Sequence, residues 1–303
     1  MVEDLIRNGP NLSALAPAQL RIAYDAIGGV TPASDDIVYQ TVSANGVPAE
    51  LGRAPGSDPV RTILYFHGGG YVIGSIASHR GLVARLGIAA KARTLAVDYR
   101  LAPEAPYPAA SDDAIAAYRW LLDQGLKANM ITFAGDSAGG GLALATLIRA
   151  RDESLPRPAG IALMSPFVDL SCSALSIRDK AVEDILVSET VVNDMASAYL
   201  GDGDRHAAYA SPLFADLTGL PPVLIHMSSS EVLLDDSVRL LGALGRANVP
   251  TSLRMWTGIP HVWQLFSAIL DEGQESLSEA GRFLATQMDK ADNDDTTWER
   301  GHD

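Results

Sequence analysis

The sequence predicts an α/β protein in which a mostly parallel central sheet is flanked by helices. Short runs of consecutive apolar residues alternate with amphipathic segments of helical length along most of the 303 residues. These apolar runs lack the polar alternation of strands that have one face in water, which favours parallel strands covered on both faces. A chain of this length can bury a sizeable core as one large domain or as a domain with an insertion.

The N-terminal part predicts a helix followed by a β-hairpin. Apolar residues recur at helical spacing over Ala16–Ile27, and the pattern stops at Gly28-Gly29. Two strand-like runs, Ile37–Val42 and Val47–Leu51, then flank the pair Asn45-Gly46. Because Asn-Gly strongly favours a tight turn, we predict a hairpin that forms the antiparallel edge of the sheet.

Six further strands and five helices are predicted to alternate after the hairpin. The strands are Thr62–Phe66, Thr94–Val97, Ile131–Ala134, Ile161–Met164, Val223–Met227 and Ser252–Trp256. The helices lie near residues 79–91, 110–124, 138–151, 233–247 and 262–288.

The alternation breaks once, between Asp169 and about Pro212. This stretch contains a predicted helix over Glu189–Leu200 with Ser188 as its N-cap. An excursion here fits the carboxyl edge of the sheet, where open α/β folds bind ligands; the alternative is an ordinary crossover helix. We therefore predict a helical cap, a main α/β domain and a polar, acidic, disordered tail. The cap comprises residues 1–34 and 170–212, the main domain 35–169 and 213–288, and the tail 289–303.

Composition narrows the possible partners. The net charge of −14 argues against binding to nucleic acid or to an anionic membrane surface. The single cysteine, Cys172, excludes an internal disulfide and is more typical of a small buried side chain than of a nucleophile. The acidic start Met1–Asp4 has no apolar segment behind it, and no run of about 20 apolar residues follows. We expect a cytoplasmic protein without a membrane span.

The segment Gly135-Asp136-Ser137-Ala138-Gly139 lies between a predicted strand and a predicted helix. A G-x-S-x-G sequence in this context is the nucleophile elbow of serine hydrolases. A serine turned sharply out of a strand needs strained backbone, and the two glycines allow neighbouring elements to approach closely. Ser137 is therefore the predicted nucleophile, and Asp136 is predicted to support the site through hydrogen bonds.

A glycine-rich loop, His67-Gly68-Gly69-Gly70, follows the strand Thr62–Phe66. Successive glycines let backbone N–H groups point outward, as an oxyanion hole requires. We predict that hole from Gly68, Gly69, Gly70 and Ala138, with His67 bracing the loop. A phosphate-binding loop is the alternative, but it would need Lys-Ser, Lys-Thr or G-x-G-x-x-G, which are not present here.

The base and acid are predicted from chain order, which is Ser, then Asp or Glu, then His in this class of site. His261 follows the last predicted strand and meets this condition. Glu231 lies just past the preceding strand, whereas Asp235 and Asp236 fall in the first turn of a helix, where carboxylates stabilise the dipole. We assign Glu231 as the partner of His261, with Asp235 as the alternative.

Four motifs in this order carry a family resemblance: His67–Gly70, Asp98–Glu104, Gly135–Gly139 and Pro260-His261. Over roughly residues 35–285 the chain resembles the hormone-sensitive-lipase-like (bacterial family IV) serine esterases. The resemblance implies an α/β-hydrolase fold with a helical cap and hydrolysis of carboxylic esters, usually of short acyl chains, through an acyl-enzyme. Many members carry Asp-Pro-Leu where Glu231-Val232-Leu233 stands here.

The expected activity is thus hydrolysis of short-to-medium-chain carboxylic esters by a Ser-His-Glu triad, without a metal or cofactor. The alternatives are an amide, lactone or formyl-aryl substrate on the same fold, or a non-catalytic receptor. The gibberellin receptors resemble this family but lack the catalytic histidine, so His261 counts against a receptor. An epoxide hydrolase or dehalogenase would place an aspartate at the position of Ser137.

Further expectations concern the substrate pocket, one loop and assembly. Phe167, Val168, Tyr199 and Trp263 are candidate walls of a pocket between cap and sheet, with core packing as the alternative. Arg100 and Glu104 are expected to brace their loop as an ion pair. Pairing through the edge strand Ser252–Trp256 would make a homodimer.

Overall fold

The structure is a computed structural model, and it describes residues 16–28 and 31–291. The predicted tail therefore lies outside the described residues except at its start, where residues 289–291 continue the last helix. Residues 1–15 and 29–30 of the predicted cap also lie outside them.

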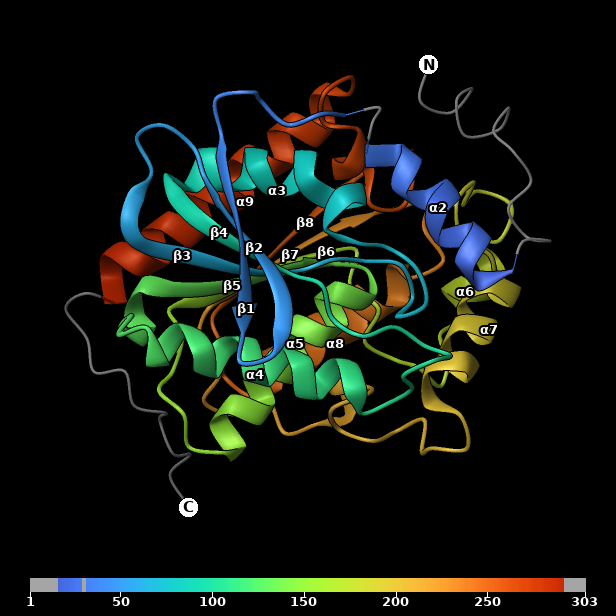
Figure 1. Ribbon diagram of the computed structural model, residues 1–303. Coiled ribbons are helices and arrows are strands. Elements are labelled where there is room, and N and C mark those ends of the chain that lie inside the picture. Colours follow the sequence, from blue (N-terminus) through green and yellow to red (C-terminus); the bar gives the residue numbers. More distant parts are fainter. Residues whose placement is uncertain (1–15, 29–30, 292–303) are drawn as a thin grey trace.

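A single eight-stranded sheet forms the centre of the molecule, in the order β1-β2-β4-β3-β5-β6-β7-β8 (Figure 1). β2 runs antiparallel to both β1 and β4, and every other pair of neighbouring strands is parallel, so the hairpin forms an antiparallel edge. All eight predicted strands are confirmed. Their bounds are β1 Val38–Ala44, β2 Val47–Arg53, β3 Asp58–Phe66, β4 Ala92–Val97, β5 Ile131–Asp136, β6 Gly160–Met164, β7 Val223–Ser228 and β8 Thr251–Trp256.

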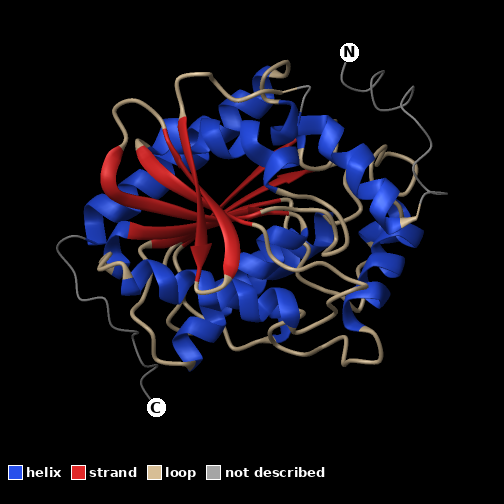
Figure 2. Cartoon of the chain, in the orientation of Figure 1, coloured by secondary structure: helices blue, strands red, loops and turns tan. Residues whose placement is uncertain are grey.

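Helices cover both faces of this sheet (Figure 2). One face packs against α3 (Ile76–Ala90) and α9 (Asp271–Ala291), and the other against α4 (Ala109–Asp123), α5 (Ala138–Asp152) and α8 (Leu234–Arg246). Each face has its own cluster of buried apolar side chains. This three-layer arrangement explains the continuous apolar runs of the central strands and confirms the predicted fold class.

The helix predicted over residues 262–288 is wrong at its start. A short 3₁₀ turn, Trp263–Phe266, comes first, and α9 begins only at Asp271. Val262 has a left-handed conformation with φ of 47°, which a helix cannot contain. The indole of Trp263 then donates a hydrogen bond to the carbonyl oxygen of Glu272, which fixes the turn against the start of α9.

The helices α2 (Pro17–Gly28), α6 (Ser176–Asp179) and α7 (Glu189–Leu200) lie at the same end of the molecule (Figure 1). Ser188 caps α7 as predicted, because its side chain accepts a hydrogen bond from the N–H of Val191. These helices belong to the two segments assigned to a cap, and that assignment stays a prediction.

The predicted ion pair between Arg100 and Glu104 is wrong. Arg100 instead pairs with Asp113 at the start of α4, and Glu104 pairs with Arg21 of α2. The guanidinium of Arg21 also donates to the carbonyl oxygen of Ala102, so α2 is bound to this loop at two points. A partner on another element could not be read from local spacing.

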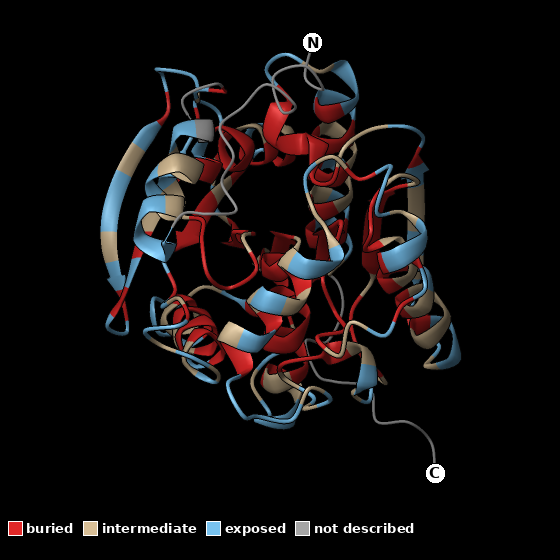
Figure 3. Ribbon diagram, turned by 90° about the vertical axis from the view of Figure 1, so that its right-hand side faces the viewer, coloured by how far each residue is buried: buried red, intermediate tan, exposed pale blue. Residues whose placement is uncertain are grey.

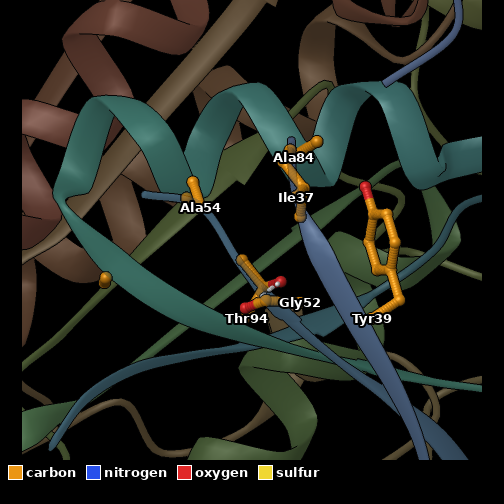
Figure 4. Close-up of a pocket in the computed structure, with 8 residues that line it drawn as sticks. Ile37, Tyr39, Gly52, Ala54, Ala84 and Thr94 are labelled. Carbon is orange, nitrogen blue, oxygen red and sulfur yellow. Dashed lines mark hydrogen bonds between the residues drawn. The ribbon is translucent and has the colours of Figure 1, made fainter. Parts of the chain in front are cut away.

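Buried residues gather in the middle of the molecule, and the edge strand β1 is mostly exposed (Figure 3). A small pocket lies between the β1–β2 hairpin and α3, lined by residues that include Tyr39, Gly52, Ala84 and Thr94 (Figure 4). Its volume of about 10 Å³ is at the lower limit for one water molecule. None of the residues proposed for catalysis lines it.

At the opposite edge, β8 pairs with β7 on one side. The described residues supply no strand for its other side. This open edge is where the homodimer was expected, and the dimer stays a prediction. Within the described part of the chain, every helix is too short or too polar to cross a bilayer.

Candidate active site

The nucleophile elbow is a sharp turn between β5 and α5. Ser137 stands at the junction with φ of 50° and ψ of −123°, so the predicted backbone strain is present. A Cβ on Gly139 would lie 2.1 Å from the carbonyl oxygen of Phe66, and one on Gly135 would lie 2.3 Å from that of Gly139. Both glycines are therefore required by close contact between β3, β5 and α5.

The side chains of Ser137, His261 and Glu231 are brought together from three loops. His261 Nε2 lies 3.0 Å from Ser137 Oγ, and its Nδ1 lies 2.8 Å from Glu231 Oε2. An ionised carboxylate can only accept, so Nδ1 carries the proton and Nε2 is free to accept from the serine hydroxyl. This arrangement is suited to removing the hydroxyl proton.

The loop that carries His261 is held by contacts from two strand ends. The N–H of Val262 donates to Ser165 Oγ at 3.4 Å, which supports its left-handed backbone. The hydroxyl of Ser228, the last residue of β7, donates to the carbonyl oxygen of Ile259 at 2.5 Å. The N–H of the same serine donates to Glu231 Oε1 at 3.0 Å. Ser228 therefore links the carboxylate to the histidine loop.

The other two acidic residues of this region lie elsewhere. Asp235 accepts a hydrogen bond from the N–H of Ser176, and Asp236 accepts from the N–H groups of Val168 and Asp169. Both stand in the first turn of α8, as expected. Among the described residues, Glu231 is the carboxylate hydrogen-bonded to the imidazole of His261.

Neighbouring charges set the protonation of His261. Burial alone would lower the pKa of the imidazole. The hydrogen bond and the charge of Glu231, together with the charges of Asp184 and Asp136, outweigh burial and raise that pKa above its ordinary value of 6.5. The surroundings thus favour the imidazolium form, which a general base must adopt during acyl transfer.

The glycine loop presents two backbone N–H groups beside the elbow. Gly69 and Gly70 have φ of 114° and 61°, conformations that favour glycine. Their N–H groups, and that of Ala138 at the start of α5, find no backbone acceptor in the described part of the chain. N–H groups without a backbone acceptor are what an oxyanion hole requires.

Gly68 is a correction to the predicted oxyanion group. Its N–H donates to Asp136 Oδ1 at 3.0 Å, so it is not available to a substrate. Asp136 is fully buried and also accepts from the hydroxyl of Tyr65 at 2.6 Å, with His79 Nε2 at 3.3 Å. Burial alone would raise the pKa of Asp136, but His79 and these hydrogen bonds lower it. Asp136 therefore supports the glycine loop from behind, as predicted.

His67 braces the same loop. Its ring is buried, stacks on Tyr99 at a centroid distance of 4.3 Å, and places Nδ1 2.8 Å from the carbonyl oxygen of Gly68. Burial and the neighbouring His79 lower the pKa of His67 to about 3. A neutral, enclosed ring of this kind fits the predicted bracing role.

The four candidate pocket residues are all buried. Phe167 donates its N–H to the carbonyl oxygen of Ser137 at 2.9 Å, and Val168 donates to Asp236. Tyr199 stacks on Tyr71 at a centroid distance of 3.9 Å. Trp263 packs against Trp256. The backbone of Phe167 is thus hydrogen-bonded to the nucleophile elbow, whereas the other three residues contact Asp236, Tyr71 and Trp256.

One residue near the site had no signal in the sequence. Met195 of α7 lies against Gly70, because a Cβ added to that glycine would be 2.0 Å from the methionine sulfur. The two residues are far apart in the chain, and a lone methionine on a predicted helix suggests only packing. The contact places α7 over the glycine loop.

Comparison with known proteins agrees with this geometry. Residues 63–265 match a family model described as the alpha/beta hydrolase fold. The chain is 43% identical over 270 residues to an acetyl-hydrolase of Streptomyces hygroscopicus, covering 88% of this chain and 89% of the relative. It is 36% identical over 284 residues to an esterase of Acinetobacter venetianus, covering 92% of each.

Solved structures give the same result. The crystal structure of an esterase from the bacterial hormone-sensitive lipase family matches with a TM-score of 0.92 and 41% identity, covering 95% of this chain and 97% of the other. A hormone-sensitive lipase from a metagenome library matches over 95% of this chain and 96% of the other, at 37% identity and a TM-score of 0.90. The chain therefore belongs to the hormone-sensitive-lipase-like esterases of the α/β-hydrolase fold.

Proposed function

We propose that this esterase hydrolyses short-to-medium-chain carboxylic esters through a Ser137-His261-Glu231 triad. The observation that carries the proposal is the unbroken chain of hydrogen bonds from Glu231 through His261 to Ser137 Oγ, near N–H groups that have no backbone acceptor among the described residues. One name and one title among the similar proteins support the short acyl chain: an acetyl-hydrolase, and a structure soaked with p-nitrophenyl butyrate.

The proposed reaction has two steps. His261 Nε2 removes the proton of the Ser137 hydroxyl while the oxygen attacks the ester carbonyl, and the N–H groups of Gly69, Gly70 and Ala138 hold the oxyanion. The imidazolium, stabilised by Glu231, then protonates the leaving alcohol. Water activated by the same imidazole releases the acid and restores the serine.

We include in this proposal a substrate pocket beneath a cap made of α2 and the segment 170–212. The contact of Met195 with Gly70 and the stacking of Tyr199 on Tyr71 support it, because they place α7 against the glycine loop. Of the four candidate wall residues, Phe167 is the one whose backbone is hydrogen-bonded to the nucleophile elbow.

The test is turnover of 4-nitrophenyl esters from acetate to palmitate by the wild-type protein and by Ser137→Ala. We expect turnover to be greatest on acetate to hexanoate and to fall by at least about 10³-fold in the variant, since removing the nucleophile disables the triad. Ser278→Ala on α9 is the control and should keep wild-type activity. Wild-type turnover by Ser137→Ala would exclude the proposed nucleophile.

Labelling with a fluorophosphonate probe separates this proposal from a receptor. An activated Ser137 should react with the probe, and Ser137→Ala should not. Matched ester and amide substrates test the other alternative: a higher kcat/KM on the amide, or on a lactone or formyl-aryl compound, would move the proposal to that substrate class.

A further inference from the structure

The loop between α6 and α7 contains a buried carboxylate, Asp184, that contacts the loop carrying Glu231. Asp184 is only 8% exposed, although Val182 beside it is 92% exposed. A buried aspartate in an otherwise exposed loop needs a specific partner. Its Oδ2 accepts a hydrogen bond from the N–H of Val232 at 2.9 Å, 48 positions along the chain. Val232 directly follows Glu231 and is itself fully buried.

The other oxygen of Asp184 fixes the chain on its own side. Its Oδ1 accepts from the N–H groups of Leu186 at 3.0 Å and Val187 at 2.9 Å, immediately before Ser188 caps α7. One carboxylate therefore joins the entry of α7 to the acid loop. Leu186 is 37% exposed, so hydrogen bonds carry much of this junction.

The charge of Asp184 also acts on the histidine. The groups that act electrostatically on His261 are Glu231, Asp184 and Asp136, and all raise the pKa of the imidazole against the effect of its burial. Among the described residues no lysine or arginine forms an ion pair with Asp184; the neighbouring Lys180 pairs with Glu183. The negative charge of Asp184 is therefore not neutralised within its own loop.

We propose that Asp184 is a positioning residue for the esterase reaction. It holds Val232, and through it the Glu231 loop, at the distance that His261 requires, and its charge stabilises the imidazolium. The inference rests on the proposed triad. It also gives the segment 170–212 a part in assembling the triad, in addition to its predicted place over the site.

The test is the pH dependence of kcat/KM for Asp184→Asn with 4-nitrophenyl butyrate. The variant has the same shape, keeps one acceptor oxygen and loses the charge. We expect the acid limb to move to lower pH by at least about 0.3 units, because a nearby negative charge favours the imidazolium. We expect kcat to fall about tenfold, the size of one lost hydrogen bond to a charged group.

Glu183→Gln is the matched control, since it removes the same charge from the adjacent, exposed position. Its acid limb and kcat should equal those of the wild type. An unchanged limb and kcat in Asp184→Asn, whatever its melting temperature, would mean that Asp184 only stabilises the loop. An equal shift in Glu183→Gln would mean that the general field of the protein is responsible. Either result overturns the proposal.

A second variant covers the case in which Asp184→Asn does not fold. Asp184→Glu keeps the charge but displaces the carboxylate, so we expect the acid limb to stay within about 0.2 units of the wild type while kcat falls. A wild-type kcat in this variant would contradict the positioning role. Failure of Ser137 to react with the fluorophosphonate would instead reject the triad itself, and this outcome does not depend on any change at Asp184.

Discussion

The chemistry of single residues in this site depends on which backbone N–H groups are already bonded within the protein. Gly68 and Gly69 are adjacent, yet the N–H of Gly68 is bonded to Asp136 while that of Gly69 has no backbone acceptor in the described chain. The aspartate beside the nucleophile thus selects which glycines remain available to a substrate. It also couples the position of the glycine loop to that of the elbow.

Gly68→Ala tests this coupling. A Cβ on Gly68 would lie 2.2 Å from Asp136 Oδ2 and 3.0 Å from its carbonyl oxygen, so the glycine loop must shift. Because two of the three proposed oxyanion donors, Gly69 and Gly70, lie on that loop, we expect kcat on 4-nitrophenyl butyrate to fall about 10²–10³-fold, the cost of one lost donor. Gly245→Ala in α8 is the control, since its Cβ would meet nothing within 4 Å. Equal kcat values for the two variants would contradict the coupling.

For single residues, the sequence predicts which residues belong to the site better than it predicts what each of them does. Motif order alone placed Ser137, Glu231 and His261, which the structure brings into hydrogen-bonding distance. It did not separate Gly68 from its neighbours, because the direction of an N–H group depends on the folded backbone. It gave no sign of Asp184, whose partner is 48 positions away.

Among the helices of the predicted cap, α7 contacts the glycine loop. Its Met195 lies on Gly70, its Tyr199 stacks on Tyr71, and the carbonyl oxygen of Tyr199 accepts from the N–H of Tyr107 at 2.7 Å. Two turns of the helix are thus attached to the loops around Ser137. The flexible thioether of Met195 lies against Gly70, one of the proposed oxyanion donors, so its removal opens space at that point.

Met195→Ala should therefore change which esters are accepted. Removing the thioether opens space over Gly70, so we expect kcat/KM for 4-nitrophenyl octanoate relative to butyrate to rise at least about threefold. The loss of packing should cost about 1–2 kcal/mol of unfolding free energy, because Met195 is only partly buried. Met255→Ala on β8, which is 49% exposed, is the control. An unchanged ratio would show that Met195 does not border the acyl chain.

The order of elements was largely predictable, and the exception shows what was missing. Apolar runs and turn residues predicted every strand, because the spacing of apolar residues and the positions of turn residues are local properties of the sequence. The helix expected from residue 262 failed because two tertiary bonds, from Val262 to Ser165 and from Trp263 to Glu272, fix a left-handed residue and a 3₁₀ turn there. The sequence of that segment is compatible with a helix until these partners are present.

At the scale of the whole molecule, buried aspartates attach the segment between β6 and β7 to the region around the start of α8. Asp184, in the loop before α7, accepts a hydrogen bond from the N–H of Val232, and Asp236 of α8 accepts from the N–H groups of Val168 and Asp169 near the beginning of the segment. Asp169 in turn pairs with Arg239 at 2.6 Å. The excursion between β6 and β7 is thus attached near its beginning to Asp236 of α8, and through Asp184, within it, to Val232 just before α8. Its attachment should therefore depend on pH.

For Asp236, the direction in which stability changes with pH can be stated. Its burial above all, and the charge of Asp169, outweigh the hydrogen bonds from Val168 and Asp169 and raise its pKa from 3.8 to about 8. Its Oδ1 has no partner among the described residues, which leaves it free to hold a proton. Because the pKa of Asp236 is higher in the folded than in the unfolded protein, the group contributes stability that is fully present below the unfolded pKa of about 3.8. That contribution is lost as the pH rises through about 8.

Asp236→Asn keeps one acceptor oxygen for the N–H groups of Val168 and Asp169 and cannot ionise. We therefore expect its free energy of unfolding, measured by urea denaturation from pH 5 to pH 9, to decline less with pH than that of the wild type. The difference in slope should approach about 1.4 kcal/mol per pH unit below pH 8 and vanish above it. Asp235→Asn, which changes the adjacent carboxylate on the same helical turn, should follow the wild-type slope. Parallel curves for wild type and Asp236→Asn would show that Asp236 is ionised in the folded protein throughout this range, and that the anchor at the start of α8 does not respond to pH.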